Sequence, residues 1–217
     1  ISRLAVGDPS IRASIDSYKV SFERLQDDRT NEDQPFGSRG GIMIRHNFPL
    51  DGEYALKIRL QRTWRDEIRG LDRPNQIEVR VDRALIKRFV VGGEGPLATW
   101  AAGQAVPTPS EYEMNADADL EVRFPVKAGA RIVTASFVNE RSEYEGAPRA
   151  LLPVTSFEFA GARDAAMGVD TVQISGPYHG TAATDTVSRQ RIFVCVPTRV
   201  QDEESCARKI LSAIGRR

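Results

Sequence analysis

Acidic and amide side chains in one predicted loop are the first candidates for chemistry in this sequence. Asn139 and Glu140 follow a stretch with strand-like alternation, and Glu143 and Glu145 come shortly after them. Carboxylate and amide oxygens are the ligands that Ca²⁺ takes in proteins. The pattern therefore predicts a calcium site at Asn139 and Glu140, with a solvated charged loop as the alternative.

A second pair of carboxylates, Asp117 and Asp119, has the i, i+2 spacing of ligands for hard cations. The pair opens a predicted strand, where such charges commonly just solvate an edge, and we favour that role. Nothing selects two particular carboxylates for acid–base catalysis, although a hidden pair stays open as a third hypothesis. We therefore predict that the chain is not an enzyme.

The two cysteines and two histidines leave several interpretations open. A zinc site would have to recruit both Cys195 and Cys206 together with distant histidines, so we do not favour it. A disulfide between the cysteines is expected if the compartment is oxidising, and two unpaired thiols otherwise. His46 is predicted to be a hydrogen-bonded core or rim residue of a strand, and His179 a turn residue.

Aromatic residues in predicted loops are candidates for stacking on sugar rings. Trp64, Trp100, Tyr112 and Tyr144 all lie in or beside such loops. Because a tryptophan is costly to expose, it either anchors its loop or meets a ligand. We select Trp100, Tyr112 and Tyr144 as candidate carbohydrate-binding residues, with loop anchoring as the alternative.

Composition and missing motifs exclude several classes of function. The sequence contains no GxSxG, HExxH, Walker A or CxxCH motif, so it carries no c-type haem attachment site of its own. Thirty basic residues balance thirty acidic ones, which argues against a nucleic-acid partner. No apolar run approaches the roughly 18 residues of a membrane span.

The elements that would position these residues are mostly strands. Apolar residues alternate with polar ones, which is typical of strands with one face in water. The alternating segments are 18–22, 42–48, 54–60, 77–81, 120–126, 133–137, 157–159 and 172–174. Turn signals separate them at 49–52 and 127–130, and Asp82-Arg83 is a further candidate for a tight turn. The pattern predicts an all-β fold, a jelly-roll-like antiparallel β-sandwich with short flanking helical segments.

The sequence is expected to divide into three segments. Residues 1–16 are predicted to be the tail of a preceding helix and a linker, and residues 17–176 the β-sandwich module. Residues 177–217 are predicted to be a linker and the start of a following helical domain, with a helix over 203–214. Long loops are predicted over 26–40 and 92–117.

Five stretches together resemble a known group of proteins. They are Ile1–Gly7, Arg39–Tyr54, Ala84–Gly93, Ala116–Gly129 and Arg189–Leu211. They resemble the central region of large secreted multidomain cytochromes of planctomycetes and other bacteria, which combine a c-type cytochrome domain with domains of unknown function. The resemblance implies an oxidoreductase parent, haem only in its other domains, and an extracytoplasmic (periplasmic or secreted) location. That location favours the Cys195–Cys206 disulfide.

The segment 131–161 is also similar to the last strands of calcium-dependent xylan-binding modules. Asn139-Glu140 matches the first metal-binding element of those modules approximately, and Arg149 is what remains of the second. The similarity implies a non-catalytic, carbohydrate-binding-like module with polysaccharide and the other domains of the parent as partners. The alternative is a structural inter-domain module with no small ligand.

Overall fold

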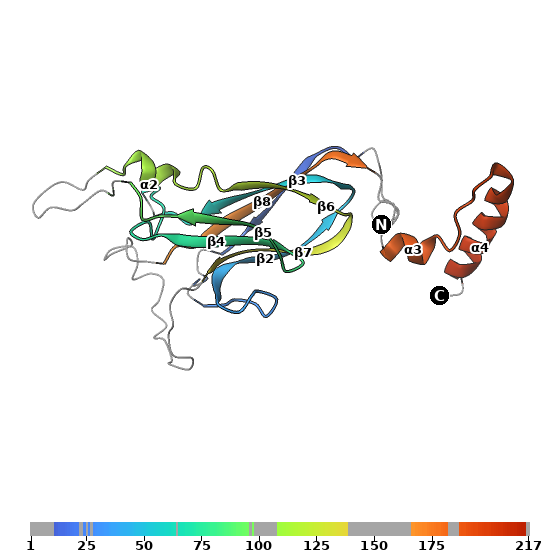
Figure 1. The fold of residues 1–217 in the computed structure, drawn as a ribbon, viewed down its shortest axis with the longest axis horizontal. Coiled ribbons are helices and arrows are strands. Elements are labelled where there is room, and N and C mark those ends of the chain that lie inside the picture. Colours follow the sequence, from blue (N-terminus) through green and yellow to red (C-terminus); the bar gives the residue numbers. More distant parts are fainter. Residues whose placement is uncertain are drawn as a thin grey trace, which may run out of the picture.

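The chain forms two antiparallel β-sheets, as seen in a computed structural model (Figure 1). The structure describes residues 11–21, 24, 26, 28–63, 65–95, 97, 108–138, 166–181 and 187–215. Each sheet has four strands, in the orders β1-β8-β3-β6 and β2-β7-β4-β5. The strands are β1 (Ser14–Lys19), β2 (Ser38–Phe48), β3 (Asp51–Leu60), β4 (Asn75–Val81), β5 (Ala84–Val91), β6 (Glu121–Val126), β7 (Gly129–Val138) and β8 (Val169–Thr181).

The pairing of the strands is nested. β1 pairs with β8, β2 with β7, β3 with β6 and β4 with β5, all antiparallel. This is the arrangement of one long hairpin folded over into two layers, which is the jelly-roll topology. The prediction of an all-β, jelly-roll-like sandwich is confirmed.

The core lies between the two sheets and comes from the alternation seen in the sequence. Leu56 and Ile58 of β3 face Ile77 and Val79 of β4 within one cluster, together with Phe137 of β7. All five side chains are fully buried. Burying such a side chain contributes roughly 1.5–3 kcal/mol, so this cluster is the main source of the module's stability.

The turns follow local chemistry. Asp82 and Arg83 join β4 to β5, and both have positive φ, at 47° and 71°. Two consecutive residues with positive φ form the type I′ hairpin turn, whose twist matches that of the strands. The tight turn predicted at Asp82-Arg83 is therefore present, although neither residue is glycine.

The first and last strands of the sandwich are longer than the alternating segments predicted from the sequence. β1 begins at Ser14, and β8 continues through a cis Gly176–Pro177 bond to Thr181. A proline normally ends a central strand because it has no N–H to donate. The first residue of β1, Ser14, pairs with Gly176, so β1 does not extend alongside Pro177. From Pro177 onward, β3 is therefore the only described strand that pairs with β8.

A short helix interrupts the predicted loop 92–117. Helix α2 (Glu111–Asn115) begins after Ser110, whose hydroxyl accepts from the Glu113 N–H while the Glu113 carboxylate accepts from the Ser110 N–H. This reciprocal arrangement is a capping box, and Ser110-x-x-Glu113 is its sequence motif.

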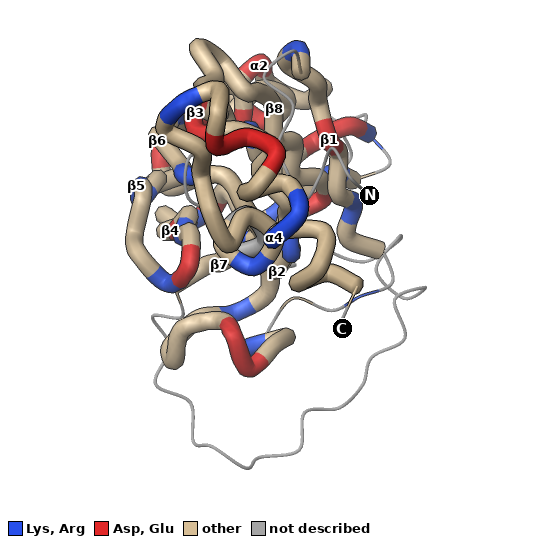
Figure 2. The backbone as a smooth tube through the Cα atoms, turned by 90° about the vertical axis from the view of Figure 1, so that its right-hand side faces the viewer, with Lys and Arg blue, Asp and Glu red and all other residues tan. Residues whose placement is uncertain are grey.

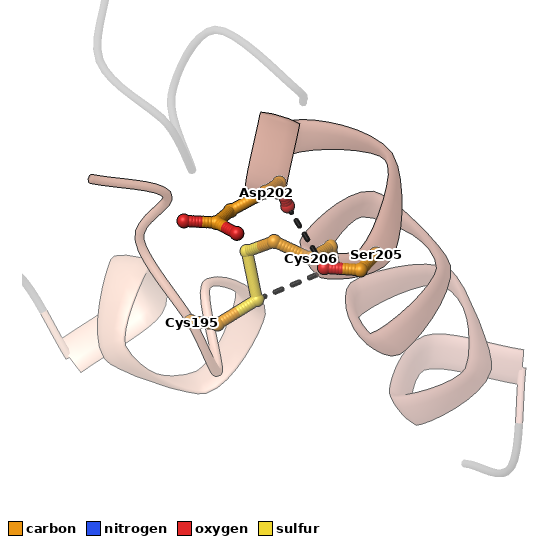
Figure 3. Close-up of a disulfide and its surroundings, with 4 residues drawn as sticks. All are labelled: Cys195, Asp202, Ser205 and Cys206. Carbon is orange, nitrogen blue, oxygen red and sulfur yellow. Dashed lines mark hydrogen bonds between the residues drawn. A yellow bond between two sulfur atoms is a disulfide. The ribbon is translucent and has the colours of Figure 1, made fainter. Parts of the chain in front are cut away.

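The C-terminal part of the described chain is helical. It contains α3 (Val187–Ile192), the 3₁₀ turn η2 (Val200–Asp202) and α4 (Glu203–Gly215), so a helix over the predicted 203–214 is present. The predicted disulfide is present too: it joins Cys195 to Cys206, with the Cα atoms 5.8 Å apart (Figure 3). Ser205 donates to the Asp202 carbonyl at the start of α4.

Basic and acidic residues are both spread along the described chain (Figure 2). None of the described helices has the length and apolar character needed to cross a bilayer.

Candidate functional site

A pocket of about 230 Å³ opens where the two sheets meet at one side of the sandwich. Residues from four strands and the β2–β3 turn line it: Ile11, Ser14, Asp16, His46, Asn47, Pro49, Tyr54, Ile174 and Gly176. We call it the edge pocket, because β1 and β2 are edge strands of their respective sheets. An apolar wall with a few convergent polar groups is typical of sites for small molecules.

The polar groups reach this pocket because β1 turns a polar face inward. Ser14, Asp16 and Tyr18 pair in register with Gly176, Ile174 and Val172 of β8. Side chains of directly opposed residues lie on the same face of a sheet. Ile174 and Val172 are core residues, so the three residues of β1 point toward the space between the sheets rather than to the outer surface.

His46 forms the wall on the β2 side. It is buried, and its Nδ1 shares a hydrogen bond of 2.8 Å with the Tyr18 hydroxyl. The ring also packs edge-on against Phe48, with centroids 4.4 Å apart. Burial lowers the pKa of His46, and the nearby Asp16 carboxylate opposes that shift without reversing it. His46 is therefore neutral at pH 7, the hydrogen-bonded rim residue expected from its place on the apolar face of a strand.

Arg131 of β7 lies opposite His46 in register, but its guanidinium is bonded to Asp82. Arg45 neighbours His46 on β2 and points to the other face of the sheet, since successive side chains of a strand alternate. Neither arginine lines the edge pocket. The pocket therefore holds a neutral imidazole with no cation on its walls.

Asp16 supplies the one carboxylate of the pocket. Its Oδ2 lies 3.9 Å from His46 Nδ1, which is beyond hydrogen-bonding distance, and its side chain is 56% exposed. Within the part of the chain that the structure describes, no hydrogen bond to this side chain is present. The carboxylate is thus available to a ligand at the mouth of the pocket.

Tyr54 forms the aromatic part of the pocket lining. Its hydroxyl donates to the Leu50 carbonyl at 3.0 Å, and its ring packs edge-on against Phe48 at 4.7 Å. Gly176 lies against the ring: a Cβ there would come within 2.5 Å of a Tyr54 ring carbon. Glycine at this position lets the backbone of β8 approach the ring closely.

Of the candidates predicted from loops, Tyr112 lies among the described residues and does not line this pocket. Trp100, Tyr144, Asn139 and Glu140 lie outside the described residues, as does Trp64. Tyr112 lies on α2, near the opposite end of β3 from Tyr54, and its ring packs against Gly95 and the core. In this position Tyr112 anchors the segment around α2, the alternative weighed for the loop aromatics.

Asp117 has a structural role. It is 1% exposed, its Oδ2 accepts from the Leu60 N–H, and its Oδ1 lies 2.8 Å from Arg62 Nη2. These contacts tie the segment after α2 to the end of β3. No group of three potential metal ligands occurs among the described residues. Asp117 is therefore committed to the backbone and to Arg62, and the favoured expectation that it solvates a strand edge is wrong for this residue because it is buried.

Sequence reasoning missed Ser14 and Asp16 because it assigned residues 1–16 to a linker. A signal was present, since Ser14 and Asp16 extend the inward face that Tyr18 and Val20 define. The remaining exposed histidine, His179, lies in the last residues of β8 with φ 52° and does not line the pocket.

No protein-family model matches the chain, and no curated protein matches it. Among solved structures, the chain is similar to the native structure of a family 35 carbohydrate binding module from Clostridium thermocellum. The TM-score is 0.32 and the identity 15%, over 75% of this chain and 90% of that module. So low a score transfers neither fold nor ligand, and both rest here on the chain's own strands and contacts.

Proposed function

We propose that the chain is a non-catalytic, carbohydrate-binding-like module and that its ligand site is the edge pocket. The observation that carries the proposal is that the polar side chains of Ser14 and Asp16 converge with an apolar wall around one cavity, in which the fully buried Tyr54 forms part of the floor. A sugar ring has an apolar face of C–H groups and a rim of hydroxyls. The apolar face packs on an apolar wall, and the hydroxyls form hydrogen bonds with carboxylate and hydroxyl groups.

The size of the pocket limits the ligand. Its 230 Å³ is below the roughly 300–1,000 Å³ of pockets for drug-sized molecules, so it fits one sugar unit. A terminal residue or a single-unit branch of a polysaccharide meets that limit.

Amide chemical shifts during titration with monosaccharides and soluble polysaccharides test the proposal. We expect saturable shifts at residues 14–18, 46–49 and 174–176. Ser14→Leu fills the pocket and abolishes them, whereas Ser17→Leu, on the outer face of the same strand, preserves them. The absence of binding at millimolar sugar, or binding that Ser14→Leu leaves intact, would refute the proposal.

We extend the proposal to location and context: an extracytoplasmic module of a larger secreted c-type cytochrome protein. The disulfide supports the location, because disulfides persist mainly in oxidising compartments. The sequence stretches that resemble secreted cytochromes support the context. A haem stain of the native polypeptide that carries this chain tests it, and a polypeptide without covalent haem would contradict it.

Calcium binding at Asn139 and Glu140 stays a prediction. A thermal melt with excess Ca²⁺, repeated after EDTA, measures it, because a ligand that binds only the folded state raises the midpoint. A calcium-dependent rise that Glu140→Gln removes would support the site, and an unchanged midpoint would contradict it.

A structural inter-domain module is the second candidate function, and one observation favours it. Large apolar side chains of the C-terminal segment are exposed: Val194, Val196, Val200, Leu211 and Ile214. Exposed apolar groups of this extent are typical of surfaces that meet another protein segment. Replacement of Val196 and Leu211 by serine would separate the two functions, because it would weaken inter-domain contact and leave sugar binding unchanged.

A further inference from the structure

The charge of the edge pocket indicates which sugars it selects. Among the described residues that line it, Asp16 is the one acidic residue, and none is a lysine or an arginine. The only other titratable side chains on its walls are His46, whose pKa is lowered by burial, and Tyr54, whose pKa is raised by burial. At pH 7 both are neutral, and the walls carry a single negative charge.

That charge is not neutralised from within the described protein. His46 makes its hydrogen bond to the Tyr18 hydroxyl, and Asp16 lies 3.9 Å from the ring. The nearest arginine in register, Arg131, is bonded to Asp82. A ligand at the mouth of the pocket therefore meets a carboxylate that no cation of the described residues pairs with, and because this side chain is 56% exposed the interaction is partly screened by solvent.

We propose that the edge pocket prefers a sugar unit bearing a protonated amine and rejects a sugar unit bearing a carboxylate. The inference rests on the proposed function, since it assumes that the pocket takes a sugar. An ammonium group placed at Asp16 makes a charge-assisted hydrogen bond with the carboxylate. A uronate in the same position puts two carboxylates together, which costs binding free energy.

Three pyranoses that differ in charge test the inference: glucosamine, glucose and glucuronate. Their dissociation constants are measured at about pH 7 by amide shift titration. We expect glucosamine to bind at least about tenfold more tightly than glucuronate, with glucose between them. Added salt reduces the ratio, because part of the interaction is exposed to solvent and is screened.

Asp16→Asn is the decisive variant. It keeps the size and the hydrogen-bonding capacity of the side chain and removes the charge, so the ratio of the two charged sugars should fall toward one while glucose affinity changes little. Glu121→Gln is the control, since Glu121 is an exposed carboxylate on β6 that does not line the pocket and its removal should leave the ratio unchanged.

The outcomes separate the two proposals. If none of the three sugars binds, the proposed function fails. If glucose binds in the pocket but glucuronate binds as tightly as glucosamine, or Asp16→Asn leaves the ratio as it is, the proposed function survives and the charge selection is overturned.

Discussion

Reduction of the Cys195–Cys206 disulfide should unfold helix α4 without unfolding the sandwich. Cys206 is the only buried residue of α4, whereas Leu211 is 70% exposed. An isolated helix of 13 residues is marginal in water. We therefore expect the disulfide to be the main constraint on α4, which it joins to the segment before it (Figure 3).

The size of the effect follows from the loop that the disulfide closes. The cysteines are separated by 11 positions, and closing such a loop in the unfolded chain is worth about 3 kcal/mol in the chain-entropy model. If that whole contribution is lost, the protection of the α4 amides against hydrogen exchange falls by about a hundredfold. The amides of Leu56 and Ile58 in β3 should keep their protection, because the sandwich core does not include α4.

Hydrogen exchange measured by mass spectrometry, with and without a reductant, checks this prediction. A double variant with serine at both cysteine positions should show the low protection in both conditions. Unchanged protection of α4 after reduction would refute the reasoning, because other contacts would then hold the helix. A simultaneous loss of protection in β3 would refute it as well, because the helix would then be part of the cooperative core.

Three further predictions concern the sandwich and its pocket. Gly176→Ala should lower the free energy of unfolding by about 1–3 kcal/mol in chemical denaturation, because the added Cβ would clash with the buried Tyr54 ring. Gly129→Ala is the control, since Gly129 also has positive φ but open space around it, and it should lower the free energy of unfolding less. An equal loss in the two variants would contradict the clash. Asp117→Ala should lower the free energy of unfolding by about 3 kcal/mol, because it leaves the buried Leu60 N–H without an acceptor and removes the carboxylate that pairs with Arg62. A loss below about 1 kcal/mol would contradict the structural role. Because the pKa of His46 is lowered in the folded state, the unfolded chain binds a proton at this imidazole more tightly than the folded chain does. The free energy of unfolding should therefore fall as pH drops below about 6.5 toward the folded-state pKa. The thermal midpoint of His46→Gln should depend less on pH in that window, and an equal pH dependence in the two proteins would contradict the prediction.

The fold was predictable from the sequence because local patterns and long-range packing agree. Alternation placed one face of β3 and β4 in the core, and the structure buries those same residues. Turn signals divided the strands correctly even at Asp82-Arg83, where glycine is absent. Jelly-roll pairing follows from neither signal alone, but it is one of few ways to cover both faces of such strands.

The site was not predictable in the same way. The edge pocket joins Asp16 to His46, which are brought together only by the register of β1 on β8 and the stacking of the sheets. A polar stretch at the start of a strand has the composition of a linker, so the sequence pattern did not indicate that Asp16 belongs to a strand. Aromatic residues in predicted loops were chosen as carbohydrate-binding candidates because exposing them is costly, yet the Tyr112 ring packs against Gly95 and the core.

The two candidate functions use different parts of the chain and do not compete. The edge pocket is built by strands of the jelly roll, whereas the exposed apolar residues lie on the segment that the disulfide holds together. A module that only linked two domains has its own use for the Asp16 carboxylate, because an inward-pointing charge on an edge strand such as β1 discourages pairing with another chain. The loss of charge selection in Asp16→Asn, rather than the position of Asp16 by itself, is therefore the result that favours ligand binding over a purely structural role.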